Sequence, residues 1–254
     1  DRARPAMRAV ASERVDRPLS KDLVAAVRKA GAKQGASFFV TLFSAFAVLV
    51  TRLTGQRDVV VGVPAAGQSA TGREMLVGHC ANLLPVRLGA TPDQSFAAVL
   101  KETRKAVLDA YDHQRFTLGD VLGRLPVARD PSRLPLVSLL FNLDTGMEGA
   151  GLSFEGLDVS FRANPRVSET FELFLNAFDS KGSVVLECQY STALWDRETI
   201  AAWLAAYEAL LAAAVEAPET PCGKLPVLSD ADRRRILVDL NQTERPIAEG
   251  TILD

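Results

Sequence analysis

Few side chains in this sequence are suited to nucleophilic or acid–base chemistry, because the chain holds only two histidines and three cysteines. His79 and Cys80 are neighbours, a combination in which an imidazole can activate a thiolate. Neighbouring residues of a β-strand point to opposite faces, so we interpret this pair as structural. The sequence has no G-x-S-x-G, G-x-G-x-x-G or Walker pattern, and no His, Cys or carboxylate cluster with metal-ligand spacing. It therefore predicts neither a catalytic centre nor a metal site.

The composition excludes several classes of protein. A formal net charge of −2 and dispersed basic residues argue against a nucleic-acid surface. Three widely spaced cysteines form no disulfide framework and are typical of a reducing compartment, so we expect a cytoplasmic location. The charged N-terminus does not resemble a signal peptide. The most apolar stretch, 36–50, is shorter than the roughly 20 residues that cross a bilayer, so no membrane contact is expected.

Apolar residues spaced three and four apart predict the helices that would position any site. Ser20 and Asp196 are suited to begin two of them, and Gly31 and Gly55 to end two. The segment 37–53 is apolar nearly all round, so we expect it between other layers. The expected helices span 20–31, 37–53, 91–113, 118–125 and 196–215.

Short apolar runs bounded by turn residues predict buried strands. The first run starts at Val59 and is expected to break at Gly62 and Pro64, and the second ends at Arg87. A flexible turn is expected at 144–151 and a hairpin turn at 181–182. The other expected strands span 136–141, 152–161, 171–179 and 183–190.

The two ends of the chain are less regular. Residues 1–18 look extended or disordered, and 217–254 look like a tail or linker with one helical turn after Ser229. The order of the elements predicts an α/β fold, in which a layered mixed sheet has covering helices.

Three groups of residues stand at characteristic spacings. Gly78, Asn82 and Arg87 fall within VGHCANLLPVR, and His113 and Gln114 begin HQRFTLGD. The third group, in RDPSRLP, comprises Arg129, Asp130, Ser132, Arg133 and Pro135. In this order they resemble the late motifs of condensation domains of nonribosomal peptide synthetases, which belong to the chloramphenicol-acetyltransferase-like acyltransferases. The chain departs from that pattern because HQRFTLGD lacks the usual Pro-Phe-Glu and Gln68 replaces the usual Arg.

The resemblance covers nearly the whole chain and implies its organisation. Residues 1–216 look like the C-terminal lobe of a condensation domain, a single chloramphenicol-acetyltransferase-like lobe, and 217–254 like a linker toward a following adenylation domain. The family's catalytic His-His-x-x-x-Asp-Gly motif belongs to the N-terminal lobe and does not occur here. We therefore expect a fragment of a longer synthetase that is inactive alone, with a naturally separate relative as the alternative.

The resemblance also implies partners. In the intact family, two tethered thioester substrates meet in a tunnel between the lobes, and their positioning accounts for much of the catalysis. The expected partners are the N-terminal lobe, the upstream and downstream carrier proteins, and the adenylation domain. Phosphopantetheine would be carried by the carrier proteins, and no cofactor is expected to bind directly. A non-catalytic docking relative and a lobe of an epimerisation or cyclisation domain remain alternatives.

The resemblance suggests a role for each motif. Asn82 and Arg87 are expected at the substrate tunnel or at the lobe interface, and a segment that bridges to the other lobe is expected within 142–165. An ion-paired loop clamp is expected from Arg129, Asp130 and Arg133, because Arg favours bidentate carboxylate contacts. Structural roles, including a helix cap for His113, are expected for the remaining motif residues: Gly78, His113, Gln114, Ser132 and Pro135.

Overall fold

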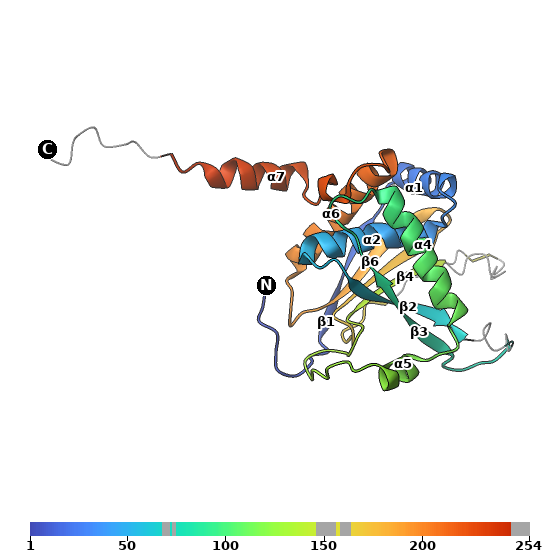
Figure 1. Cartoon of the computed structure of the whole chain (residues 1–254). Helices are drawn as coiled ribbons and strands as arrows, with labels where there is room; N and C mark the ends of the chain where they lie inside the picture. The colour runs from blue at the N-terminus through green and yellow to red at the C-terminus, as the bar shows by residue number, and fades with distance from the viewer. Residues whose placement is uncertain (68–71, 73–74, 146–155, 158–163, 245–254) are drawn as a thin grey trace, which may run out of the picture.

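A six-stranded β-sheet organises the chain (Figure 1). The computed structural model describes residues 1–67, 72, 75–145, 156–157 and 164–244. The strand order is β1-β6-β5-β4-β2-β3, in which β2–β4 and β4–β5 are parallel and the other neighbours antiparallel. The predicted mixed α/β sheet is therefore confirmed. The strands are β1 (Ser12–Pro18), β2 (Val59–Ala66), β3 (Ala81–Leu88), β4 (Leu139–Thr145), β5 (Leu173–Ser180) and β6 (Ser183–Ser191).

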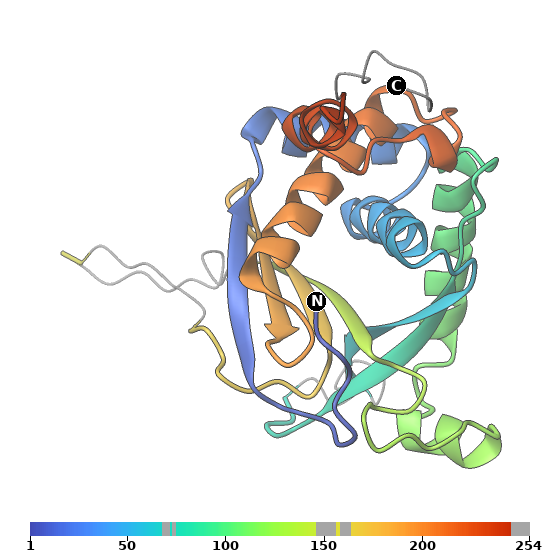
Figure 2. The same ribbon diagram turned by 90° about the vertical axis from the view of Figure 1, so that its left-hand side faces the viewer.

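Helices α1, α2, α4 and α6 all lie on one side of the sheet, as Figure 2 shows. The shorter helix α5 contacts the edge strand β3, and α7 extends away from the body (Figure 1). The helices are α1 (Lys21–Lys33), α2 (Phe38–Thr54), α4 (Phe96–Asp112), α5 (Leu118–Arg124), α6 (Arg197–Glu216) and α7 (Asp230–Leu237), with 3-10 turns η2 (Cys222–Lys224) and η3 (Asp239–Asn241).

The phenylalanines of α2 attach the helix layer to the middle of the sheet. Phe141 of β4 packs on Phe43 with ring centroids 5.1 Å apart, and Phe39 and Phe46 lie 5.7 and 5.4 Å from it. Burying one such ring stabilises the fold by about 1.5–3 kcal/mol. The run 40–51 of α2 is buried on every side, as predicted for a helix that is apolar all round.

The first helix does not end where the sequence predicted. It continues through Gly31 to Lys33. A Cβ at position 31 would lie 2.3 Å from Oγ1 of Thr41 on α2. The glycine is therefore required by the close approach of two helices and not by a helix end.

The start of α4 also differs from the prediction, since the helix begins at Phe96 and not at Thr91. Ser95 is its N-cap, and the hydroxyl accepts a hydrogen bond from the N–H of Ala98. Elsewhere the predicted helix ends are confirmed to within two residues, with Gly55 in the left-handed conformation at φ +71°. The same serine chemistry begins α1, α2 and α7, at Ser20, Ser37 and Ser229.

Two strands have boundaries that the sequence did not predict. β2 runs through Gly62 and Pro64 without a break. Its parallel pairing with β4 ends at Gly62, so the missing N–H of Pro64 removes no hydrogen bond between these two strands. β4 starts at Leu139, three residues late, because Leu136 has φ +68° and the N–H of Val137 donates to the carbonyl of Pro135. That local turn is incompatible with a strand.

The N-terminal segment provides an edge strand. Of the two interpretations of 1–18, extended and disordered, the extended one is confirmed, because β1 pairs with β6 and places Val15 opposite Cys188 in the core. The hairpin turn between β5 and β6 is also confirmed, with positive φ at Lys181 and Gly182.

Part of the predicted region between β4 and β5 can be placed. Asp144 and Thr145 belong to β4 rather than to the expected turn. The rest of that turn, most of the expected strand 152–161 and most of the expected bridging segment 142–165 lie outside the described residues.

The first part of the predicted tail packs against the body. Cys222 and Leu225 are buried, and the guanidinium of Arg52 on α2 donates to both of their carbonyls at 2.6 and 2.9 Å. The N–H of Cys222 donates in turn to the carbonyl of Gln94. Helix α7 follows, with two turns where the sequence predicted one.

One described helix, α6, is long and apolar enough to span a membrane by length and composition alone, and α1 and α2 meet the same criterion as a pair bent by 100°. The apolar residues of α6 are used inside the protein. Ile200, Tyr207, Leu210 and Leu211 are fully buried in the core. These helices therefore behave as core helices of a folded domain.

Candidate functional site

A row of connected polar side chains crosses four strands of the sheet. We call it the polar ladder. The amide nitrogen of Asn142 donates to Oδ1 of Asn176 at 3.1 Å, and the amide nitrogen of Asn176 donates to Oε2 of Glu187 at 3.0 Å. The ladder runs from β4 through β5 and β6 to β1 and consists of Asp144, Asn142, Asn176, Glu187, Arg14 and Asp16.

The ladder lies on the face of the sheet opposite to the helices. Phe141 and Leu175 pack into the core beneath α2, and consecutive strand residues point to opposite faces. Their neighbours Asn142 and Asn176 therefore point away from the helices. The strand register holds the row in line, because Asn142 is paired with Asn176, and Asn176 with Glu187.

The ladder is well packed, and its groups are satisfied. Asn176 is only 8% exposed, and the side chains of Arg14 and Glu187 are 14% and 12% exposed. Arg14 lies 3.3 Å from Glu187 and 2.8 Å from Asp16. A buried polar network with its partners made holds its groups in fixed positions. Three carboxylates against one guanidinium leave the ladder negative. Both of its ends are exposed, and of the two Asp16 is paired with Arg14 while Asp144 accepts a hydrogen bond from Asn142.

Asn82 lies at the other edge of the sheet and is fully engaged with the backbone. Its amide nitrogen donates to the carbonyls of Gln114 and Phe116, both at 2.9 Å, and its Oδ1 accepts from the N–H of Leu83. These bonds fix the connection between α4 and α5 on β3. Asn82 therefore binds the backbone of this chain, and its expected place at the substrate tunnel or the lobe interface stays a prediction.

His113 closes the end of α4. It is the C-cap residue, and its Nδ1 lies 2.8 Å from the carbonyl oxygen of Asp109. Arg87 points outward from β3 and binds Asp58 through two contacts of 2.8 and 2.6 Å. The hydrogen bond from Arg87 lowers the pKa of the Asp58 carboxyl below its usual value. Both side chains are exposed, so the pair contributes little to stability.

Gly78 precedes β3 in an exposed loop, and no atom would lie within 4 Å of a Cβ placed there. Gly78 and Arg87 therefore lie apart from the polar ladder, at the surface around the edge strand.

The loop Arg129–Pro135 is a self-contained turn. Asp130 accepts from the hydroxyl and the N–H of Ser132, at 2.6 and 2.8 Å, and pairs with Arg133 at 3.0 Å. Hydrogen bonds from Ser132 are the main cause of the lowered pKa of Asp130. Arg129 is exposed and makes no ion pair with a described residue. The expected clamp is therefore built by Asp130, Ser132 and Arg133.

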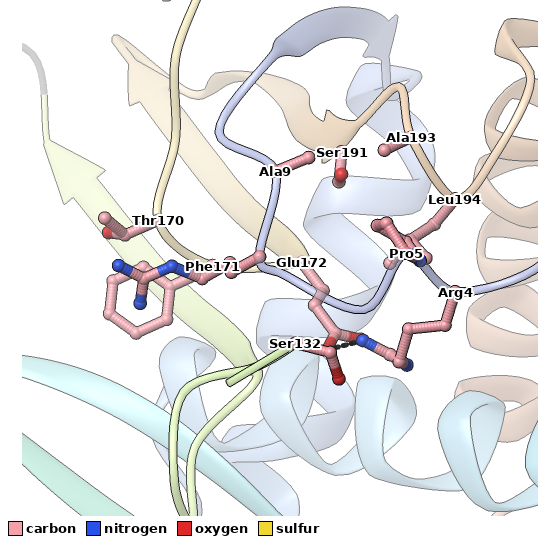
Figure 3. Close-up of a pocket in the computed structure, with 11 residues that line it drawn as sticks. Arg4, Pro5, Ala9, Ser132, Thr170, Phe171, Glu172, Ser191, Ala193 and Leu194 are labelled. Carbon is pink, nitrogen blue, oxygen red and sulfur yellow. Dashed lines mark hydrogen bonds and ion pairs between the residues drawn. The ribbon is translucent and has the colours of Figure 1, made fainter. Parts of the chain in front are cut away.

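Figure 3 shows what this loop touches. Arg4 of the N-terminal segment binds Glu172 through two contacts of 2.6 and 2.9 Å beside Ser132, and the N–H of Arg8 donates to the carbonyl of Pro131. The space left between them is about 10 Å³, which holds at most one water. The loop thus fastens the N-terminal segment and leaves no room for a substrate.

Among the described residues, no histidine forms a hydrogen bond with a hydroxyl or a thiol. His79 and Cys80 precede β3 in a loop and not in a strand, and no hydrogen bond joins their side chains. Burial raises the pKa of Cys188 to about 12 and that of Cys222 to about 11, so both thiols are neutral. No cluster of three metal-binding side chains occurs among the described residues.

Comparison with known proteins decides the family. The family model for condensation domains matches residues 1–237. This chain belongs to the condensation-domain family. Surfactin synthase subunit 2 of Bacillus subtilis is 32% identical over 99% of this chain, and tyrocidine synthase 3 of Brevibacillus parabrevis is 28% identical over all of it. The chain spans only 7% and 4% of the lengths of those two proteins.

Solved condensation-domain structures have the same fold. A four-domain nonribosomal peptide synthetase bound to AMP and glycine superposes with a TM-score of 0.82 at 19% identity, over 92% of this chain and 19% of that one. The X-domain from teicoplanin biosynthesis gives 0.79 at 22% identity, over 90% of this chain and 52% of that one. The resemblance of the sequence to condensation domains of nonribosomal peptide synthetases is thereby confirmed.

The polar ladder is the part of this condensation-domain chain that sequence reasoning missed. Its signal is present in the strand LLFNLDT, in which Asn142 and Asp144 occupy alternate positions among apolar residues, and in LFLNAFDS, in which Asn176 stands between apolar neighbours. Within one strand, each of those polar residues only interrupts an apolar run. The register of the sheet is what places them side by side.

Proposed function

We propose that this chain is the C-terminal lobe of a peptide-bond-forming condensation domain. The donor is an acyl or peptidyl thioester and the acceptor an aminoacyl thioester, each held on a carrier protein by phosphopantetheine. The acceptor nitrogen attacks the donor carbonyl carbon, the C–S bond breaks, and an amide and a free thiol form. The proton lost by the amine ends on the thiol sulfur. Holding both thioesters in place supplies much of the rate.

The observation that carries this proposal is the sheet face bearing the polar ladder. Among the described residues, the strands that form it have helices on the other face only (Figure 2). A row of fixed polar groups on a sheet face without described helices suits one wall of a hydrated channel. Its negative charge favours entry of the acceptor as an ammonium, which must lose one proton to water before the neutral amine attacks, and exposed Asp144 is the group we assign to that contact.

The chain alone is proposed to be inactive. The sequence lacks His-His-x-x-x-Asp-Gly, and no histidine among the described residues hydrogen-bonds to a hydroxyl or a thiol. In this proposal the reactive histidines come from an N-terminal lobe, which closes the channel. Both carrier proteins and the adenylation domain are the other partners. Residues 217–254 form the linker to the adenylation domain, and the section through Leu225 is held on this lobe by Arg52.

We place the assembly in the cytoplasm. The cysteines Cys80, Cys188 and Cys222 are all free thiols, which a reducing compartment preserves.

Amide formation by loaded carrier proteins tests the proposal. Donor-loaded and acceptor-loaded carrier proteins are incubated with the 254-residue chain, or with a protein that carries this lobe behind an N-terminal lobe with the histidine motif, and dipeptide is measured by mass spectrometry. We expect dipeptide only with the two-lobed protein. Dipeptide from the single chain above the rate in buffer would contradict the proposed division of labour.

A pair of variants tests the channel wall. In the two-lobed protein, Asp144→Asn should raise the KM for the acceptor-loaded carrier protein several-fold and leave the KM for the donor-loaded carrier protein unchanged. Asp109→Asn removes an equally exposed carboxylate on α4, paired with Lys105, and should change neither. Equal effects of the two substitutions would remove Asp144 from the channel.

A docking module without chemistry is the second candidate, because the sequence lacks His-His-x-x-x-Asp-Gly. The two-lobed protein separates the candidates, because a docking module binds carrier proteins without producing dipeptide. Lobes of epimerisation and cyclisation domains would be recognised by their products in the same assay.

A further inference from the structure

An apolar cavity lies between α2 and α6, on the helix side of the sheet and away from the polar ladder. Its volume is about 260 Å³. Leu139, Leu173, Leu175 and Cys188 form its floor on three strands, while the helices form its walls. Protein interiors are otherwise close-packed, and voids of this size are rare.

Apart from the indole N–H groups of Trp195 and Trp203 at the mouth, no polar group of the cavity lining is free to bind a ligand's charge. The two hydroxyls in the lining are committed: Thr54 donates to the carbonyl of Val50 and Tyr207 to that of Leu42, both at 2.8 Å. Cys188 is a neutral thiol. Because an unpaired charge in such a site is costly, the buried part of any ligand must be uncharged and apolar.

The lining of the cavity extends along both helices. It runs from Phe46 to Thr54 on α2 and from Ile200 to Tyr207 on α6, which correspond to about 12 and about 10 Å of helix. A volume of about 260 Å³ along that length suits an extended chain better than a compact ring system.

The mouth is open and aromatic. Leu53 is 40% exposed, and Trp195 and Trp203 form an edge-to-face pair with ring centroids 5.5 Å apart. Asp196, next to Trp195, is already paired with Arg2. Indole rings suit the boundary between a buried chain and water, because they present an apolar body and one N–H donor.

We propose that this cavity binds an unbranched alkyl or acyl chain of about ten carbons, with the polar end at the two tryptophans. The length follows from volume, because an apolar cavity of about 150 Å³ holds the six carbons of benzene. The site is independent of the proposed peptide-bond chemistry, since it lies on the opposite face of the sheet. It would let the lobe hold a lipid-like group that is not the substrate.

A series of 1-alkanols from hexanol to tetradecanol tests the proposal on the 254-residue chain. Binding is followed by the fluorescence of Trp195 and Trp203, which are the only tryptophans of the chain, and by calorimetry. We expect one site per chain and an affinity that rises about fourfold per added carbon. The rise should stop near ten carbons, where the cavity is full. An affinity that keeps rising through tetradecanol, or no binding, overturns the proposal.

Two variants fill the cavity from different strands. Cys188→Leu on β6 and Leu139→Phe on β4 each add volume to the floor and should weaken decanol binding at least tenfold. Cys188→Ala leaves the space open and should bind as the parent does. Two filling variants are used so that one remains informative if the other fails to fold. Unchanged decanol affinity in a folded filling variant overturns the proposal. The proposal is also overturned if the chain forms a dimer that buries Trp203 and if decanol does not dissociate that dimer, because a second copy of the chain would then cover the cavity.

Discussion

Replacing Gly31 by alanine sets two well-known effects against each other. In the middle of a helix, Gly→Ala normally stabilises by about 1 kcal/mol. Here the new Cβ would lie 2.3 Å from Oγ1 of Thr41 and 3.2 Å from the carbonyl oxygen of Ala36. The first distance is about an ångström shorter than van der Waals contact allows, and neither partner can simply swing away, because Thr41 is buried in α2 and Ala36 is buried in the loop before it.

The clash can be relieved in two ways, and each has a cost. Moving α1 away from α2 loosens a packed interface, which costs about 1–3 kcal/mol. Rotating Thr41 breaks its 2.9 Å hydrogen bond to the carbonyl of Ser37, which costs about 1 kcal/mol and leaves a strained rotamer. After subtracting the gain in helix propensity, Gly31→Ala should destabilise the protein by about 2 kcal/mol.

A double-mutant cycle isolates the contact. Thr41→Ala removes the clashing oxygen, so Gly31→Ala in that background should be neutral or stabilising by up to about 1 kcal/mol. Free energies of unfolding come from urea titration followed by circular dichroism. If Gly31→Ala stabilises the parent chain, or destabilises both backgrounds equally, then the close approach of α1 and α2 is wrong.

Three further predictions concern other contacts. Asn82→Ala leaves two backbone carbonyls after α4 without their hydrogen-bond donor, so urea titration should show a free energy of unfolding lower by about 1–2 kcal/mol. Asn241→Ala, at an exposed position with one such bond, is the control and should have a smaller effect. Arg52→Met removes both hydrogen bonds to the carbonyls of Cys222 and Leu225, and trypsin should then cleave after Lys224 several-fold faster than in the parent. Because burial raises the pKa of Cys188 to about 12, that thiol stays protonated at pH 8; iodoacetamide should label Cys80 first and Cys188 only after unfolding, as peptide mass spectrometry would show.

Local chemistry made the helices predictable. Ser20 and Ser37 offer a hydroxyl to an unpaired N–H, and Gly55 adopts the left-handed conformation that other residues avoid. These signals act over three or four residues, so one sequence contains all the information needed. Gly31 carries the same local signal as Gly55, yet its cause is a side chain ten residues away on another helix. Only the packed structure distinguishes the two glycines.

Long-range pairing set the limits of what the sequence could predict. The edge strand β1 has no strong apolar pattern, and it forms because β6 offers its backbone to it across more than 170 residues. The candidate site shows the same limit. The motif residues Asn82 and His113 were visible as a pattern, but their bonds to the α4–α5 connection were not. The polar ladder was invisible because its members come from four strands.

The form of the polar ladder bears on what can lie against it. If a second lobe packed tightly on this face, Glu187 and Arg14 would lose their remaining hydration, and burying an ion pair without new partners costs more than it returns. A hydrated channel avoids that cost, since water continues to solvate the charges while the strands hold them in place. A ladder whose groups are hydrogen-bonded to one another and whose two end carboxylates, Asp144 and Asp16, are exposed is therefore better suited to a passage for polar substrates than to a dry interface.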